Sequence, residues 1–395
     1  MLTVEEAIAR LRASAHLMTT PETVPVAGAL RRALAEDVMA AVDVPPADNS
    51  AMDGYALRRS DWPRTGEAMA ISQRITAGSA PRPLEPGTAA RIFTGAELPE
   101  GADTVVMQEN TEGAGAGAVN ILELAELGAN IRRRGQDIAR GAVILERGTR
   151  LRAQELGQLA SLGREAVECY RPLRVALIST GDELVEPGKA LGPGQIYNSN
   201  RYTVAGLMQG WGFEMVDLGI LRDDPAAIGA SMEEAAERAD VILTTGGVSV
   251  GEEDHVRDVV ESLGGIDLWK IAIKPGKPFA FGRVGDTPFL GLPGNPVSVF
   301  VTLAVVARGF LFDCQGADVT EPRSATLPAA FDRPADSRED YLRVRVCDRG
   351  LELFPSQSSG VLTSLCWSDG LARQRPGEAI RAGDAVDYFP FEVWL

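Results

Sequence analysis

Residues 241–249 read VILTTGGVS, an apolar and β-branched run that ends in two adjacent glycines. Such a run is typical of a strand buried on both faces, followed by a tight turn. Two more apolar runs, 173–179 and 289–292, also end in glycine turns, TGDE at 180–183 and PGNP at 293–296. Helical patterns separate these runs. We therefore expect a parallel sheet with helices on both faces, a three-layer αβα domain.

The chain on either side of this core has a different character, so we expect a multidomain α/β protein. Helical patterns at 3–16, 27–40 and 152–163 predict a helical N-terminal domain. Short apolar segments between Gly and Pro turns predict a β domain inserted into it, and alternating residues after 340 predict a C-terminal β-barrel. The predicted domains are 1–46 with 147–170, 47–146, 171–322 and 323–395.

Composition excludes several classes of protein. The 395 residues carry a formal net charge of −16, which argues against a nucleic-acid partner because phosphates bind positive surfaces. With four scattered cysteines and two histidines, any catalytic metal should be a hard cation on carboxylates, such as Mg²⁺. Residues 1–20 lack the apolar core of a signal peptide, and we expect no run of membrane-spanning length. A cytoplasmic protein without a membrane partner is therefore expected.

The glycine turn after the 241–245 run is a candidate anion site. Gly246 and Gly247 free backbone N–H groups to form a nest, and Ser249 follows them. Carboxylates at 252–254, with Asp254 last, suit a divalent cation. An ordinary strand-to-loop turn is the alternative, just as the acidic turn at 180–183 is either a cation ligand set or a helix cap.

The turn at 274–278 reads KPGKP, and its prolines restrict the directions of Lys274 and Lys277. Lys270 shares the face of Lys274 if 267–273 is extended, because strand side chains alternate. These lysines are candidates to bind phosphate or another oxyanion. In the PGNP turn, Asn295 is a natural N-cap and Pro296 suits the first helical position, which exposes N–H groups to an anion. A plain helix start is the alternative.

Two motifs lie before the core. The Asp53–Gly54 pair is typical of a structural turn. The run Arg132–Arg134 is either a solvated face or, beside an anion site, a contact to substrate phosphate.

Together these motifs resemble the molybdopterin molybdenumtransferase family, to which MoeA and the gephyrin E domain belong. The matching segments occur in chain order at 49–55, 92–96, 131–138, 178–184, 245–254, 274–278 and 292–296. The resemblance implies an αβα domain of the molybdenum cofactor biosynthesis type. It also implies an enzyme that inserts molybdate into adenylylated molybdopterin with Mg²⁺, releasing AMP and giving molybdenum cofactor.

The resemblance carries functional roles to matching positions. It implies catalytic roles for Asp53, Asp137, Glu183, Asp254, Lys270 and Lys274. It implies substrate contacts at Thr94, Arg132, Pro293, Pro296, Arg338 and Ser359. The implied metal ligands are Glu183, Asp223 and Asp254, with Asp224 as the alternative to its neighbour.

The resemblance further implies a homodimer whose site joins one subunit's sheet domain to the partner's N-terminal region. The molybdopterin adenylyltransferase and molybdoenzyme chaperones are candidate partners. Two other functions stay open. One is that adenylyltransferase activity itself, although it belongs to a small single domain, and the other is a non-catalytic scaffold like gephyrin.

Overall fold

A computed structural model describes residues 1–63, 67–247 and 255–394, and the chain separates into two compact units. The larger unit comprises Met1–Glu36, Arg147–Arg152 and Ala166–Leu395, and the smaller unit comprises Asp37–Glu146 and Ala153–Glu165. The finer division into four domains stays a prediction.

The central sheet of the larger unit has six strands in the order β17-β14-β18-β22-β21-β19. Their bounds are Glu214–Leu221, Arg174–Thr180, Val241–Thr245, Thr287–Leu292, Pro278–Val284 and Gly264–Lys270. The first four are parallel to one another, as the apolar runs predict. Strand β21 is antiparallel to both of its neighbours, β22 and β19, and only a short turn joins it to β22.

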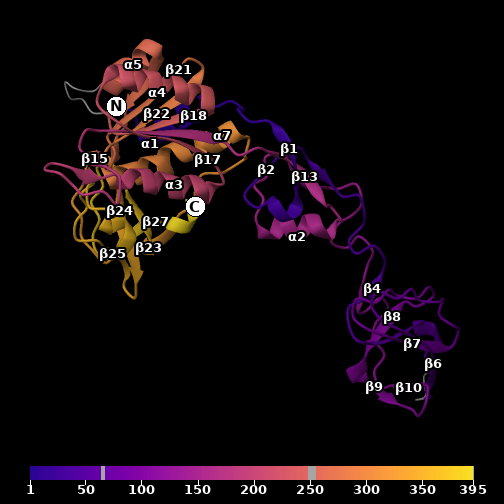
Figure 1. Cartoon of the computed structure of the whole chain (residues 1–395). Coiled ribbons are helices and arrows are strands. Elements are labelled where there is room, and N and C mark those ends of the chain that lie inside the picture. The colour runs from indigo at the N-terminus through magenta and orange to yellow at the C-terminus, as the bar shows by residue number, and fades with distance from the viewer. Residues whose placement is uncertain (64–66, 248–254, 395) are drawn as a thin grey trace. The chain divides into compact units, whose positions relative to one another are not determined.

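Helices cover both faces of this sheet (Figure 1). On one face, α4 (Pro225–Arg238) and α5 (His255–Leu263) pack on strand residues in one apolar cluster. On the other, α3 (Ser199–Trp211) and α1 (Val4–Ser14) contribute to a larger cluster. The α/β class and the layers therefore follow from strands that are apolar on both sides.

A long buried helix follows β22. It runs as α6 (Pro296–Val301), a π-helical segment (Thr302–Ala307) and α7 (Arg308–Gln315). The expectation that no segment reaches membrane-spanning length is wrong for Pro296–Gln315, which is long and apolar enough. However, 89% of its most apolar window is buried inside the structure, so its apolar surface packs in the core.

The C-terminal part of the larger unit is a second sheet, ordered β20-β24-β26-β27-β23, with β25 also beside β24. The bounds are Ile273–Lys274, Glu339–Cys347, Gly370–Gln374, Ala385–Pro390, Ala325–Pro328 and Gly350–Leu353. A bridge between Ala329 and Leu351 links the two ends of the sheet, giving it a barrel-like closure. Helix α8 (Thr363–Trp367) lies between β25 and β26.

The N-terminal segment is less helical than predicted. Helix α1 forms as expected, with a capping box between Thr3 and Glu6. The helix expected over 27–40 is wrong, because this stretch contains β2 (Ala33–Leu34) and β3 (Val38–Met39). Strand β2 pairs with β13 (Ala166–Tyr170), which pairs in turn with β1 (Pro21–Pro25). Pairing with a distant strand overrides the local helical preference.

The smaller unit is mainly β, as expected for the inserted region. Its six-stranded sheet has the order β8-β5-β7-β6-β10-β9. These strands are Thr104–Met107, Gly54–Leu57, Thr88–Ile92, Met69–Ile75, Ala118–Ile121 and Thr111–Gly113. Two short pairs join β4 (Asn49–Ser50) to β11 (Ile131–Arg132) and β3 to β12 (Val143–Leu145). Helix α2 (Ala153–Ser161) completes the unit.

Candidate active site

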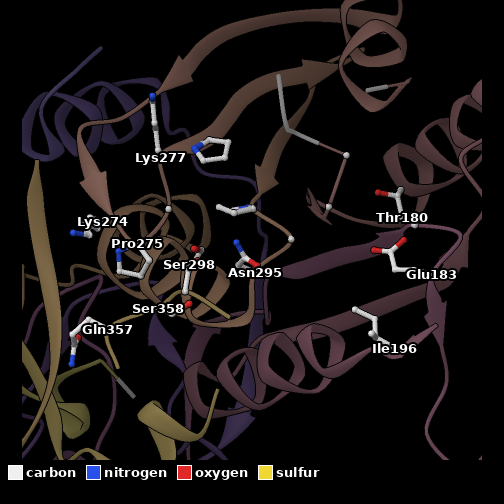
Figure 2. A pocket seen from close by; sticks show the side chains of 18 of the residues that line it. Thr180, Glu183, Ile196, Lys274, Pro275, Lys277, Asn295, Ser298, Gln357 and Ser358 are labelled. Atoms are coloured by element: carbon white, nitrogen blue, oxygen red, sulfur yellow. The ribbon is translucent and has the colours of Figure 1, made fainter. Parts of the chain in front are cut away.

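A cleft of about 800 Å³ opens at the carboxyl ends of β14, β18 and β22. This is the edge where ligands bind in open α/β sheets. One wall comes from the ends of these strands and the KPGKP turn, and another comes from the C-terminal segment around Ser358 (Figure 2). The cleft thus joins the three glycine turns identified in the sequence into one site.

The two glycines after β18 lie close to the end of β14. At Gly246 a Cβ would lie 2.7 Å from the Thr180 carbonyl oxygen, and at Gly247 it would lie 2.3 Å from a methyl carbon of Val256. Both glycines have positive φ, 94° and 66°. Only glycine therefore fits here, which supports the predicted backbone nest. Beside it, the Thr180 hydroxyl is buried and has no hydrogen-bond partner within the described ranges.

Carboxylates gather on the same side of the cleft. Glu183 and Asp223 both line it, and the pKa of Asp223 is raised by burial and by the neighbouring charges of Asp182 and Glu183. A cation would offset this repulsion. Asp224 instead caps α4, since its carboxylate accepts the Ala227 N–H at 3.0 Å. The geometry therefore favours Asp223 over Asp224 as the cleft carboxylate.

The metal prediction extends beyond what the structure describes. Asp254 and Ser249 lie in 248–254, outside the described residues. Among residues 1–63, 67–247 and 255–394, no group of three His, Cys, Asp or Glu side chains is placed to hold a metal ion. Glu183 and Asp223 are therefore the two predicted ligands whose positions are known.

The KPGKP turn contributes Lys274 and Lys277 to the cleft. Lys270 does not line it. The assumption that 267–273 is one extended strand is wrong, because β19 ends at Lys270 and β20 begins at Ile273 in the other sheet. Leu2 occupies the break, where its N–H donates to the Lys270 carbonyl and its carbonyl accepts from Ala272. The alternation that would place Lys270 beside Lys274 is lost at this break.

The PGNP turn lies at the cleft, but its asparagine does not cap the helix as the sequence suggests. Asn295 occupies the N-cap position of α6, but its side chain makes no capping hydrogen bond and faces the cleft (Figure 2). Pro293 lines the cleft, whereas Pro296 begins the helix outside the lining set. The Asn295 side chain therefore lines the cleft instead of capping the helix, a placement that the sequence interpretation did not give it.

The C-terminal wall contains Arg338 and Ser359, the two residues that the resemblance matches to substrate contacts. Gln357 and Ser358, from the same segment, line it as well, and the sequence pattern there allows the match to shift by a residue. Gln357 fixes this loop to β24. Its Oε1 accepts the Arg343 N–H at 2.9 Å and its Nε2 donates to the Arg343 carbonyl at 3.2 Å. At the other end, the Ser359 carbonyl accepts the Val297 N–H at 3.0 Å. The loop is thus held between strand β24 and the start of helix α6.

In the smaller unit, the structure brings Asp53 and Thr94 together. Asp53 Oδ1 accepts both the backbone N–H and the hydroxyl of Thr94, each at 2.8 Å. These two hydrogen bonds lower the pKa of Asp53, and the charge of Arg91 adds to the effect. The two residues come from segments 49–55 and 92–96, so both matched segments meet at one point.

Comparisons with known proteins agree along the chain. Three family models match: "MoeA N-terminal region (domain I and II)" over 2–163, "Probable molybdopterin binding domain" over 176–313, and "MoeA C-terminal region (domain IV)" over 326–391. A molybdopterin molybdenumtransferase of Haemophilus influenzae is 44% identical over 317 residues, 80% of this chain and 78% of the relative. The chain belongs to the molybdopterin molybdenumtransferase family.

Other members show the same similarity. Molybdopterin molybdenumtransferase 2 of Mycobacterium tuberculosis is 40% identical over 332 residues, covering 81% of this chain and 82% of the relative. The crystal structure of the molybdopterin biosynthesis MoeA protein from Pyrococcus horikoshii superposes with a TM-score of 0.85 at 28% identity, over 99% of this chain and 100% of that one. The family assignment made from the ordered motifs is therefore confirmed.

Two residues that the molybdopterin molybdenumtransferase resemblance assigns to the site are exposed in the smaller unit. Arg132 lies in β11, and Asp137 follows in the next turn. The basic run beside them is partly neutralised, since Arg133 pairs with Asp48 and Arg134 pairs with Asp43, each at 2.6 Å. Arg132 is the remaining arginine of the run, and its contact to substrate stays a prediction.

Proposed function

We propose that this chain is a molybdopterin molybdenumtransferase, an enzyme of molybdenum cofactor biosynthesis that acts by molybdenum insertion. One observation carries the proposal: a single cleft gathers the glycine nest, two lysines and two carboxylates. The family relatives bear the corresponding name. Matches to the N-terminal and C-terminal MoeA regions do not favour a single-domain adenylyltransferase.

The finer part of the proposal concerns the substrates, which are adenylylated molybdopterin and molybdate. Both are oxyanions at the reacting centre. The nest at Gly246 and Gly247 and the turn with Lys274 and Lys277 supply donors and positive charge for them. Such groups stabilise negative charge that develops when the adenylate leaves as AMP.

Mg²⁺ is proposed as the cofactor because the carboxylates fit it. Glu183 and Asp223 would hold the ion, since oxygen ligands suit Mg²⁺. Burial, and then the charges of Asp182 and Glu183, raise the pKa of Asp223, and a cation would offset both effects. When bound, the ion would polarise the adenylate phosphate oxygens. Gly181 makes room for this arrangement, because a Cβ there would lie 2.4 Å from a Glu183 carboxylate oxygen.

Two further parts of the proposal are homodimerisation, which rests on the family resemblance, and a cytoplasmic location, which rests on the sequence composition. Mass measurement in solution tests the first. A stable monomer with full activity would remove the expectation that the partner's N-terminal region completes the site.

The deciding experiment measures AMP release from adenylylated molybdopterin with and without molybdate. We expect release only when molybdate is present, and a strong loss in Glu183→Gln. The matched control is Glu352→Gln, which removes an exposed ion pair with Arg345 in the C-terminal sheet, away from the cleft. Consumption of ATP with molybdopterin would favour the adenylyltransferase, and absence of both activities would favour the scaffold.

A further inference from the structure

The ammonium group of Lys274 is held by carboxylates of the C-terminal sheet. Its Nζ lies 2.6 Å from Asp336 Oδ2 and 3.5 Å from Asp340 Oδ2. In the close view of the cleft, the lysine amine points away from Thr180 and Glu183 (Figure 2). A lysine that lines the cleft is therefore turned toward the start of β24, the neighbouring strand of its own sheet.

Asp336 is the stronger of the two carboxylate partners. Asp340 is almost fully buried and also pairs with Arg333 at 3.0 Å, so its charge is shared. Asp336 keeps one oxygen on Lys274, while its other oxygen accepts the Arg338 N–H at 3.1 Å. The hydrogen bond from Lys274 is the main reason that the pKa of Asp336 is lowered.

The backbone holds the two partners in register. Strand β20 pairs in parallel with the start of β24, which places Lys274 opposite Asp340. The Arg338 guanidinium donates to the Ile273 carbonyl at 3.1 Å, which fastens the Asp336 turn to β20. The ion pair therefore joins two segments that are already fixed, and forming it costs little backbone order.

We propose that Asp336 is a positioning residue that holds Lys274 on the side of the C-terminal sheet, so that an oxyanion entering the cleft competes with Asp336 for this lysine. Asp336 thereby sets how strongly the Lys274 ammonium group can interact with the substrate. The identity of the oxyanion rests on the proposed function, whereas the hold on Lys274 does not. Among the residues that the structure describes, the charged groups around the lysine are Asp336, Asp340, Arg333 and Arg338.

The first test measures how fast an acetylating reagent modifies Lys274, by mass spectrometry, with exposed Lys277 as the internal reference. An ammonium group that is held against a carboxylate by a hydrogen bond is less accessible to the reagent and reacts more slowly. We expect Asp336→Asn to raise the relative rate at Lys274 several-fold, and Asp336→Glu to keep it low. Asp387→Asn is the matched control, because this carboxylate pairs with Arg373 and Arg375 and has the same 23% side-chain exposure as Asp336.

The second test separates a positioning role from a structural one. Asp336→Asn should lower the KM for molybdate or adenylylated molybdopterin by a factor of roughly 2 to 5, the range expected for a partly exposed ion pair. In a Lys274→Met background the same substitution should change nothing. An unchanged labelling rate, a raised KM for both substrates, or an equal effect without the lysine would overturn the proposal. If neither the wild type nor any variant releases AMP, the proposed function fails. The labelling result still decides the role of Asp336 in that case.

Discussion

Replacing Gly246 with alanine tests whether the nest depends on close approach between β18 and β14. The new Cβ would lie 2.7 Å from the Thr180 carbonyl oxygen, closer than the 3.0 Å below which such contacts essentially never occur. That oxygen belongs to the backbone of a central strand and cannot move alone. The Gly246 N–H also donates to the Leu292 carbonyl at 3.2 Å, so a shift would disturb β22 as well.

Backbone strain and a steric clash both destabilise Gly246→Ala, and a substitution at a second glycine distinguishes the two effects. A side chain at left-handed φ costs about 1–2 kcal/mol, and forced overpacking adds about 1–3 kcal/mol. Gly188 has the same φ of 94° but nothing within 4 Å of its added Cβ. Gly188→Ala therefore carries the backbone strain alone, and the difference between the variants isolates the contact with Thr180.

Hydrogen exchange of peptides from β14 and β18 measures this difference locally. We expect exchange in Gly246→Ala to be about 5- to 150-fold faster than in Gly188→Ala, the factor that 1–3 kcal/mol represents. AMP release should fall with it, because the displaced turn can no longer present its N–H groups. Equal exchange in the two variants would refute the steric reasoning.

Three further outcomes are expected. Thr94→Val removes one of two hydrogen bonds to Asp53 and should raise the pKa of Asp53 part of the way to its ordinary value of 3.8, as NMR titration would show; an unchanged value would contradict this. The raised pKa of Asp223 disfavours its charged form in the folded state, so the free energy of unfolding should fall as the pH rises from 3.8 through the folded-state pKa. In thermal unfolding, Mg²⁺ should reduce this fall in the wild type but not in Glu183→Gln. Lys274→Met should lower kcat for AMP release by about 10²-fold, and a change confined to KM would argue against a role in charge stabilisation.

Much of the site could be predicted because its signals are local. A buried strand ending in Gly246 and Gly247 needs only neighbouring residues to be recognised, and parallel strands bring such ends to one edge. The KPGKP turn is equally local. Knowledge of a family added Asp53 and Thr94 as candidate site residues, and the structure then showed the hydrogen bonds between them.

The predictions fail where contacts between segments that are distant in the sequence determine the structure. The stretch 27–40 has a helical composition but pairs through β2 with β13, which follows more than one hundred residues later in the sequence. Lys270 was misplaced because Leu2 pairs between two strands that the pattern joins into one. Gln357 has no motif at all. Its importance comes from hydrogen bonds to β24, which only the folded chain displays.

The loop that Gln357 holds also bears on how the enzyme is made. Its residues complete a cleft whose opposite wall, at Thr180, leaves the ribosome much earlier. Domains fold largely in order of synthesis. The central sheet can therefore form while the cleft still lacks its last wall, and full affinity for substrate should appear only after the C-terminal sheet has closed on it.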